Sequence, residues 1–241
     1  MRASTARILV FAKVPEAGLV KTRLIPALGA EGACEIHTSL VERTLALAVR
    51  VGVPVELWLD GEAAHPTVAA WRNHYRLRVR RQRGAGLGAR MQQAIRQTLR
   101  TSRSVLVLGC DCVTLTEYEL RFTVQRLRSM DAVIAPARDG GYVMLGVSRP
   151  ADSLLQRVPW GTRHVLAETQ RRMRALGWRY RLLDWQHDVD RPVDLHRALR
   201  GLSKGKLATG RVGDHRINAE RASELTCGVA YAALYGSRMP D

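Results

Sequence analysis

Residues 7–24 read RILVFAKVPEAGLVKTRL and join an apolar run to a basic loop. Ile8–Ala12 is uninterrupted and has no helical period, which predicts a buried strand that ends before Pro15. The loop that follows holds donors for phosphate oxygens: Lys13, Lys21, Thr22 and Arg23. Gly18 allows the backbone to approach a ligand closely. We therefore predict a phosphate-binding loop, although neither G-x-G-x-x-G nor G-x-x-x-x-G-K-[ST] is present and a merely solvated basic loop is the alternative.

Outward from this stretch, apolar strands alternate with amphipathic helices, which predicts an α/β fold with a mainly parallel central sheet flanked by helices. Strands are expected at 7–12, 54–60, 76–82, 104–109, 131–137, 142–147 and 178–184. Helices are expected at 31–51, 65–74, 87–101, 115–128, 161–176 and 192–201. After Leu202 the sequence becomes basic and glycine-punctuated without a period. We expect one domain over 1–202 and a linker-like or partly disordered tail over 203–241.

Composition narrows the protein class. The chain has 241 residues, of which 46% are hydrophobic, enough for one sizeable core. It has no apolar run near the ~20 residues of a membrane span and no apolar signal region, so we expect a cytoplasmic protein. The spacing of Cys110 and Cys112 resembles no zinc site, and small buried side chains at a strand end are the favoured interpretation.

The formal net charge of +16 fits an anionic substrate, and it also fits nonspecific attraction to nucleic acid. Aromatic residues make up only 5% of the chain, too few for a platform on which single-stranded bases stack. The arginines are spread over several predicted helices rather than gathered in one cluster. Nucleic acid is therefore the less favoured partner.

Two acidic positions predict a metal site. Asp111 follows the apolar strand Val105–Gly109, at the sheet edge where the phosphate loop also opens. Beside bound phosphate a carboxylate requires a divalent cation, and Mg²⁺ takes one or two carboxylates together with phosphate oxygens; capping of the next helix is the alternative for Asp111. In the run Asp188–Asp194, Val189 is expected to point inward. Asp188 and Asp190 then share a side, so that Asp190 completes the site, while Asp194 serves a helix N-terminus.

Three glycine-containing segments complete the candidate site. Gln82, Gly86, Gly88 and Arg90 surround a helix start whose backbone amides can meet a base, ribose or phosphate, with a flexible connector as the alternative. Asp139, Gly140, Gly141 and Tyr142 form either a hairpin turn or an acceptor-binding loop in which Asp139 is a base. Trp160 and Thr162 open a helix, where the indole either packs on a sugar face or belongs to the core.

The order of five motifs resembles a known family. These are FAKVPEAGLVKTRL (11–24), LGCDCVTLT (108–116), PARDGGY (136–142), PWGT (159–162) and DVD (188–190). They resemble a bacterial family of glycosyltransferase-like proteins, described as arsenosugar-biosynthesis glycosyltransferases, within the nucleotide-diphospho-sugar transferase superfamily. The family is related to molybdenum-cofactor and phospholactate nucleotidyltransferases, and the resemblance spans 7 to about 201.

This resemblance implies a Rossmann-like glycosyltransferase A fold, an NTP or NDP-sugar donor, and Mg²⁺ or Mn²⁺ held by Asp111 and Asp190. The chain departs from the family at Val113, usually proline, and at Arg191, usually threonine. A proline would make the turn after Asp111 more rigid, and Arg191 adds a cation near the metal.

Three functions remain open. The first is a metal-dependent glycosyltransferase that passes a sugar from an NDP-sugar to an unidentified small acceptor, with Asp111, Lys21 and Asp139 as catalytic residues. The second is a nucleotidyltransferase that joins NMP to a phosphorylated acceptor and releases pyrophosphate; the lone carboxylate of Cys110–Cys112 favours it. The third is a noncatalytic binder of nucleotide or nucleic acid. Binding to nucleic acid would weaken steeply with salt and would not depend on Asp111.

Overall fold

The computed structural model describes residues 6–150 and 152–194. The central sheet has seven strands in the order β3-β2-β1-β4-β6-β5-β7. They are β1 (Arg7–Lys13), β2 (Val55–Asp60), β3 (Arg78–Arg81), β4 (Val105–Gly109), β5 (Ala132–Pro136), β6 (Tyr142–Val147) and β7 (Tyr180–Leu182). β6 pairs antiparallel with both β4 and β5, and the other pairs are parallel. All seven predicted strands and the mainly parallel sheet are confirmed.

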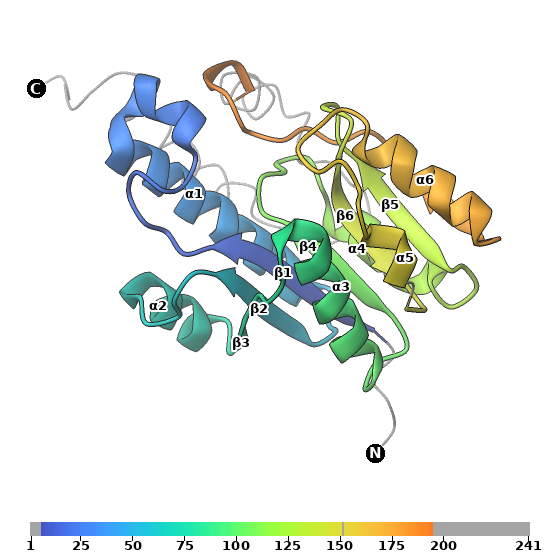
Figure 1. The fold of residues 1–241 in the computed structure, drawn as a ribbon. Helices are drawn as coiled ribbons and strands as arrows, with labels where there is room; N and C mark the ends of the chain where they lie inside the picture. Colours follow the sequence, from blue (N-terminus) through green and yellow to red (C-terminus); the bar gives the residue numbers. More distant parts are fainter. Residues whose placement is uncertain (1–5, 151, 195–241) are drawn as a thin grey trace, which may run out of the picture.

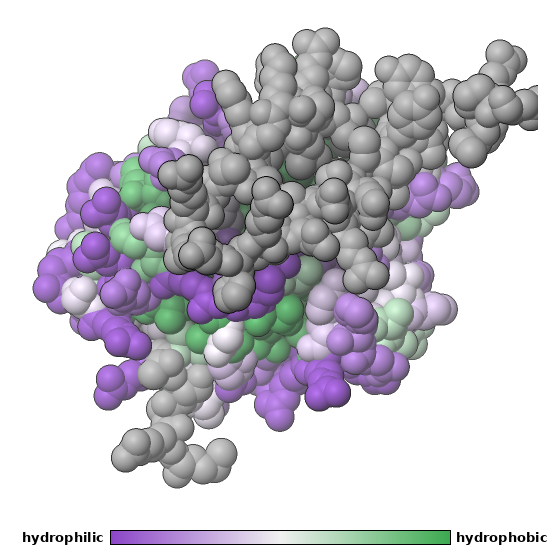
Figure 2. Space-filling view, turned by 180° about the vertical axis from the view of Figure 1, so that it is seen from behind, coloured by the Kyte–Doolittle hydropathy of each residue, from purple (hydrophilic) through white to green (hydrophobic). Residues whose placement is uncertain are grey.

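Helices cover both faces of the sheet (Figure 1). They are α1 (Ile25–Arg50), α2 (Pro66–His74), α3 (Gly86–Leu99), α4 (Glu117–Arg126), α5 (Asp152–Leu155) and α6 (Val165–Ala175). Successive residues of a strand point to opposite faces. Ile8 and Val10 accordingly pack with α1, α2 and α4, whereas Leu9 and Phe11 pack with α3, α5 and α6. Figure 2 shows hydrophilic side chains over much of the described surface, with hydrophobic patches between them.

Several helix boundaries differ from the prediction. The first helix was expected over 31–51 but begins at Ile25 with Pro26 in its first turn, where the missing amide costs nothing, and Gly29 breaks the helical backbone with a φ of 73°. The fifth was expected over 161–176 but begins only at Val165, and the short α5 was not predicted. Of the helix expected over 192–201, only 192–194 lie within the described residues, and they are helical. The tail expected over 203–241 lies outside them.

Local signals for two helix starts are confirmed. Pro66 occupies the first turn of α2, where a proline ring fits without loss of a hydrogen bond. Thr116 and Glu119 form a reciprocal capping box at α4, in which the Thr116 side chain accepts from the Glu119 amide and the Glu119 carboxylate accepts from the Thr116 amide. Because Thr116 caps α4, the alternative interpretation of Asp111 as its cap is wrong.

The turn between β5 and β6 depends on a close contact at Gly140. This residue has a φ of +90°, and an added Cβ would lie 2.2 Å from the carbonyl oxygen of Arg163. Gly161, in the loop that contains Arg163, has a φ of +77°, but apart from its chain neighbours no described residue lies within 4 Å of an added Cβ. An alanine at Gly140 would therefore meet both backbone strain and a steric clash, whereas an alanine at Gly161 would meet backbone strain alone.

We expect Gly140→Ala to lower the free energy of unfolding by about 3 kcal/mol, because the methyl group adds a clash to an unfavourable φ. Gly161→Ala should cost only about 1 kcal/mol, since it meets strain alone. Urea unfolding followed by circular dichroism measures both values. Equal losses would show that the contact with Arg163 does not restrict the hairpin.

Candidate active site

Lys21 lies at the centre of the candidate site. It precedes the short 3₁₀ turn Thr22–Leu24 and has a left-handed backbone, with φ 46° and ψ 40°. Its Nζ lies 2.5 Å from Oδ1 of Asp111 and 3.3 Å from Oδ1 of Asp190, and it donates to the carbonyl oxygen of Val189 at 2.6 Å. The Lys21 side chain is only 5% exposed, whereas the two carboxylates are about half exposed. One buried cation thus joins the carboxylates of two distant segments.

The two carboxylate segments are held together by backbone pairing. Cys112 and Asp188 form an antiparallel bridge. The amide of Val189 donates to the carbonyl of Asp111 at 2.9 Å, and the amide of Val113 donates to the carbonyl of His187 at 3.1 Å. Asp111 and Asp190 are therefore fixed as neighbours by the main chain as well as by Lys21. The sequence predicts that they converge, and the structure brings them together.

Buried side chains also stabilise the turn after Asp111. The Arg43 guanidinium donates to the carbonyls of Cys112 at 3.3 Å and of Val113 at 2.6 Å. Gln186, which is 3% exposed, accepts from the hydroxyl of Thr114 at 2.8 Å. The hydrogen bonds that Arg43 donates therefore restrain this turn. The turn has Val113 where the family that the sequence resembles usually has proline.

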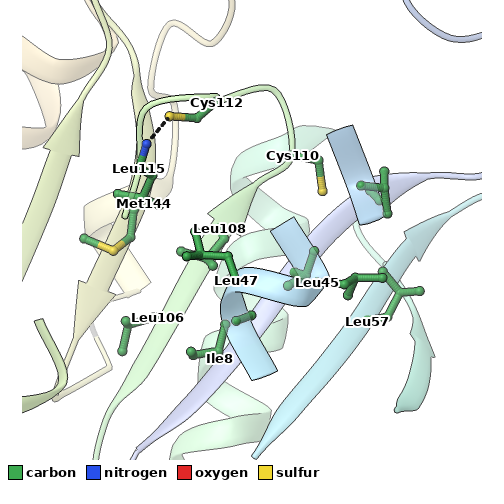
Figure 3. Close-up of a cluster of buried hydrophobic side chains, with 14 of the residues drawn as sticks. Ile8, Leu45, Leu47, Leu57, Leu106, Leu108, Cys110, Cys112, Leu115 and Met144 are labelled. Carbon is green, nitrogen blue, oxygen red and sulfur yellow. Dashed lines mark hydrogen bonds between the residues drawn. The ribbon is translucent and has the colours of Figure 1, made fainter. Parts of the chain in front are cut away.

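Cys110 and Cys112 turn away from the candidate site. They are 4% and 3% exposed and belong to the hydrophobic cluster under α1 (Figure 3). Burial raises the pKa of both thiols. The interpretation of these residues as small buried side chains is confirmed, and Asp111 alone of the Cys-Asp-Cys motif presents a carboxylate to the site.

Asp188 is the residue whose importance the sequence did not reveal. Its pKa is raised to about 7, first by burial and then by the carboxylates of Asp139, Asp111 and Asp190, while Lys21 opposes the rise. The same interactions place four carboxylates in one electrostatic cluster. The Asp188–Asp190 alternation was recognised, and Val189 does point inward at 1% exposure, but the burial of Asp188 depends on a strand bridge that the sequence does not display.

The raised pKa makes Asp188 a source of pH-dependent stability. The folded protein retains a proton that the unfolded chain releases near the ordinary pKa of about 4, so the free energy of unfolding falls as pH rises from about 4 to 7. We expect Asp188→Asn to stabilise the protein by about 2 kcal/mol at pH 8, with a smaller gain near pH 4. Urea unfolding of both proteins at several pH values measures this. A gain that does not grow with pH would contradict the assignment.

The remaining residues of the predicted phosphate loop occupy its open surface. Arg23 donates to Oδ2 of Asp190 at 3.1 Å. Lys13 and Thr22 are exposed. Gly18 has a φ of +84° with open space around it. His37 underlies this loop, since its Nε2 lies 3.0 Å from the Lys13 carbonyl oxygen and burial lowers its pKa. This histidine holds the end of β1 and was not identified from the sequence.

Gln82 and Arg90, the two polar residues beside the predicted nucleotide loop, make hydrogen bonds and an ion pair within the protein. The amide nitrogen of Gln82 donates to the carbonyls of Ala12 at 3.3 Å and of Trp58 at 2.9 Å. Arg90 pairs with Asp60 and donates to the Gly84 carbonyl. The two side chains flank the loop, as the sequence predicts, and they already hold the ends of β1 and β2 and the turn before α3. Gly86, with a φ of +83°, remains open.

Gly88 and Trp160 connect this loop to the predicted acceptor loop. A Cβ on Gly88 would lie 2.5 Å from Nε1 of Trp160 and 2.4 Å from the Leu155 carbonyl oxygen. Trp160 also makes an edge-to-face contact with Tyr142, with ring centroids 6.0 Å apart. Burial raises the pKa of the Tyr142 hydroxyl, which lies in the core. Gly88, Tyr142 and Trp160 thus form a packing contact, and the Tyr142 hydroxyl does not face the site.

Residues 139–142 are interpreted from the sequence either as a hairpin turn or as an acceptor-binding loop, and the geometry is compatible with both. Residues 137–141 form the hairpin turn between β5 and β6, as the alternative reading expected, and Oδ1 of Asp139 accepts from the Gly141 amide at 2.8 Å. Asp139 nevertheless raises the pKa of Asp188, so it lies at the border of the carboxylate cluster. Thr162 donates to the Pro159 carbonyl at 2.8 Å and accepts from the His164 amide, which shapes the turn before α6.

The last predicted residue, Asp194, behaves as expected at a helix start. Its Oδ2 accepts from the amide of Arg191 at 2.9 Å and from that of Asp190 at 3.4 Å. These bonds satisfy amides at the beginning of the helical residues 192–194. They also restrain the backbone of Asp190 beside Lys21.

Comparison with known proteins agrees with this fold. A family model described as an uncharacterized protein conserved in bacteria (DUF2064) matches residues 44–162, just under half of the chain. A crystal structure of a candidate nucleotide-diphospho-sugar transferase from Desulfovibrio desulfuricans has a TM-score of 0.79 and 25% identity, covering 95% of this chain and 98% of that one. This chain thus has the fold of glycosyltransferase-like and nucleotidyltransferase-like enzymes. No curated protein matches the sequence.

More distant structures share the fold. CMP:2-keto-3-deoxy-manno-octonic acid synthetase complexed with CTP has a TM-score of 0.54 at 13% identity, covering 85% of this chain and all of that one. The manganese complex of Rv0371c from Mycobacterium tuberculosis has a TM-score of 0.54 at 21% identity, covering 82% and 99%. The predicted fold and superfamily are confirmed, and the arsenosugar-type subfamily stays a prediction. The described residues contain no helix that is both long and apolar enough to cross a membrane.

Proposed function

We propose that the protein is a metal-dependent transferase that uses a nucleotide-activated donor, and that it transfers the sugar of an NDP-sugar to a small acceptor. The observation that carries this proposal is the contact of Lys21 with both Asp111 and Asp190. These two carboxylates hold the Lys21 ammonium group at the sheet edge where open α/β folds bind ligands. The exposed Lys13, Thr22 and Arg23 lie on the adjoining loop and supply donors for phosphate.

The donor set fits a divalent cation of the magnesium type. Asp111 and Asp190 would hold it, and no group of three or more His, Cys, Asp or Glu suited to a metal occurs in the part of the chain that is described. Mg²⁺ accepts such a sparse protein set, because phosphate oxygens and water complete its coordination. When bound, the cation supplies neutralisation of the charge that develops on the diphosphate leaving group.

The protein's own cations would share this charge. Lys21 and Arg23 contact the same carboxylate, Asp190, so each can exchange that contact for a phosphate oxygen nearby. Lys13, at the exposed end of β1, would bind the far side of the diphosphate. Such fixed cations stabilise a transition state more than a ground state when the charge grows during the reaction.

Proton removal from an acceptor hydroxyl has two candidate bases. The Gly141 amide donates to Oδ1 of Asp139 at 2.8 Å, which gives this carboxylate a defined orientation. Asp188 has a pKa of about 7, which suits a group that must both take and release a proton near neutral pH. Asp139 is the proposed base and Asp188 is the alternative, while an anionic acceptor would need neither.

Nucleotidyl transfer is the second candidate function. Asp111 is the only carboxylate of the Cys-Asp-Cys motif, whereas paired D-x-D carboxylates are typical of many glycosyltransferases. The phosphate loop argues against it: between residues 13 and 23 only Gly18 offers unhindered backbone, and a triphosphate is usually wrapped by more amides.

The products distinguish the two functions. The protein is incubated with Mg²⁺ and panels of NDP-sugars and NTPs, with small acceptors, and free NDP and pyrophosphate are measured. Glycosyl transfer is expected to release NDP, and pyrophosphate from an NTP would instead establish nucleotidyl transfer. A thermal-shift panel of nucleotides with and without Mg²⁺ first identifies the preferred nucleobase. A ligand that binds the native state raises the apparent stability of the protein. Nucleotide binding without any turnover would leave the noncatalytic interpretation.

A further inference from the structure

A second concave surface lies at the edge of the sheet opposite Asp111. It is a cavity of about 650 Å³ at the beginnings of β4, β5 and β7 and the C-terminal end of α4. Ser104 lines this cavity and Asp111 lies beyond the other end of β4. At about 3.3 Å per strand residue, the two sites are roughly 20 Å apart. The cavity is therefore separate from the candidate active site.

The cavity concentrates positive charge that forms no ion pair among the described residues. Arg103, Arg128 and Arg179 line it, and no ion pair of these three guanidinium groups occurs within residues 6–150 and 152–194. Asp131, the carboxylate in the lining, is already paired: Oδ1 lies 3.2 Å from Arg149 and Oδ2 accepts from the Arg179 amide at 2.8 Å. Among the described residues, no carboxylate therefore pairs with the three guanidinium groups.

The rest of the lining is apolar or neutral. Val124, Leu127 and Met130 form an apolar wall at the end of α4, and Leu127 is only 4% exposed. Ser129 and Ser148 also line the cavity, and their hydroxyls donate to the carbonyls of Arg126 and Met130. Pockets of 300–1,000 Å³ with apolar walls and a few converging polar groups are typical sites for small molecules. Guanidinium groups bind phosphate oxygens in pairs, which gives both affinity and orientation.

We propose that this cavity is a second ligand site that binds a small organic phosphate with an apolar body. The phosphate group contacts Arg103, Arg128 and Arg179, and the apolar body packs against Val124, Leu127 and Met130. A nucleic acid fits less well, because its backbone requires an extended basic track rather than an apolar-walled cavity of this volume. The site needs no residue of the proposed active site.

The test uses phenyl phosphate as the probe, with inorganic phosphate as the comparison, in isothermal titration calorimetry on the full chain. Arg128→Ala combined with Arg179→Ala is expected to weaken phenyl phosphate binding at least about tenfold, since each lost charge-assisted contact weakens binding severalfold. The matched control replaces Arg100 and Arg174, which are exposed and lie outside the cavity lining, and so removes the same net charge. Its affinity should stay within about twofold of the unmodified protein.

A second variant tests the cavity without removing an arginine. Val124→Glu places a carboxylate in the half-buried apolar wall and should weaken phenyl phosphate binding by a similar factor. Phenyl phosphate should also bind about tenfold more tightly than inorganic phosphate, because its ring buries apolar area. Asp111→Asn should leave these affinities unchanged. Absence of binding, equal affinity for both anions, insensitivity to the cavity variants, or displacement by a DNA oligonucleotide would overturn the proposal.

Discussion

Asp111→Asn is expected to lower the turnover of the donor that the product assay identifies by about 10³-fold. The amide keeps the size of the side chain but removes its charge, so the site loses one of two carboxylates for the divalent cation and the partner of Lys21. Loss of an electrostatic group placed at developing charge commonly reduces turnover by 10²–10³. Steady-state kinetics under saturating Mg²⁺ and donor measures the change.

Binding of Mn²⁺, followed by electron paramagnetic resonance, supplies a readout that does not depend on the reaction. Asp111→Asn should weaken Mn²⁺ binding at least about tenfold. Asp184→Asn is the matched control, since Asp184 is an exposed aspartate close in sequence to Asp190. Its Mn²⁺ affinity should be unchanged. Full turnover in Asp111→Asn would refute the metal site, whereas loss of turnover with normal Mn²⁺ binding would assign Asp111 another role.

Lys21→Met is expected to have two opposite effects. Turnover should fall by about 10²-fold, because the diphosphate loses a cation that is fixed beside it. Mn²⁺ affinity of the protein without nucleotide should rise by about tenfold, because the Lys21 ammonium lies between the two carboxylates that would hold the metal and competes with it. Methionine retains most of the length and apolar character of the buried lysine stem.

The same two measurements, turnover and Mn²⁺ resonance, decide this prediction. Lys13→Met is the control for the second effect, since Lys13 is exposed and is a member of none of the ion pairs found among the described residues near Asp111. Its Mn²⁺ affinity should not rise. If Lys21→Met instead weakened Mn²⁺ binding, the lysine would be supporting the metal site rather than competing for it.

Much of the fold could be predicted because its signals are local. Ile8–Ala12 is buried on both faces of the sheet, and its sequence is therefore an apolar run. Thr116 and Glu119 mark the start of α4 by a capping pattern that involves no distant residue. The convergence of Lys21, Asp111 and Asp190 could be inferred as well, because strand ends in a parallel sheet lie along one edge.

Other parts of the site depend on contacts between distant segments. The raised pKa of Asp188 requires the bridge to Cys112, and the buried amide of Gln186 and the Arg43 guanidinium gain partners only after folding. The polar ends of Gln82 and Arg90 suggested ligand donors, but carbonyl groups and Asp60 occupy them. Sequence spacing shows which polar groups could bind a ligand. It does not show which of these groups are already hydrogen-bonded or ion-paired within the protein.

The absence of a side chain at Gly88 has a consequence for engineering. Trp160 packs directly on this glycine, so the segments that we propose for donor and acceptor binding are in direct contact. Reshaping the acceptor side by replacing Trp160 would also leave a void against the first turn of α3, and selectivity for the two substrates would change together. A library aimed at new acceptors would do better to preserve this pair and vary exposed neighbours such as Arg163.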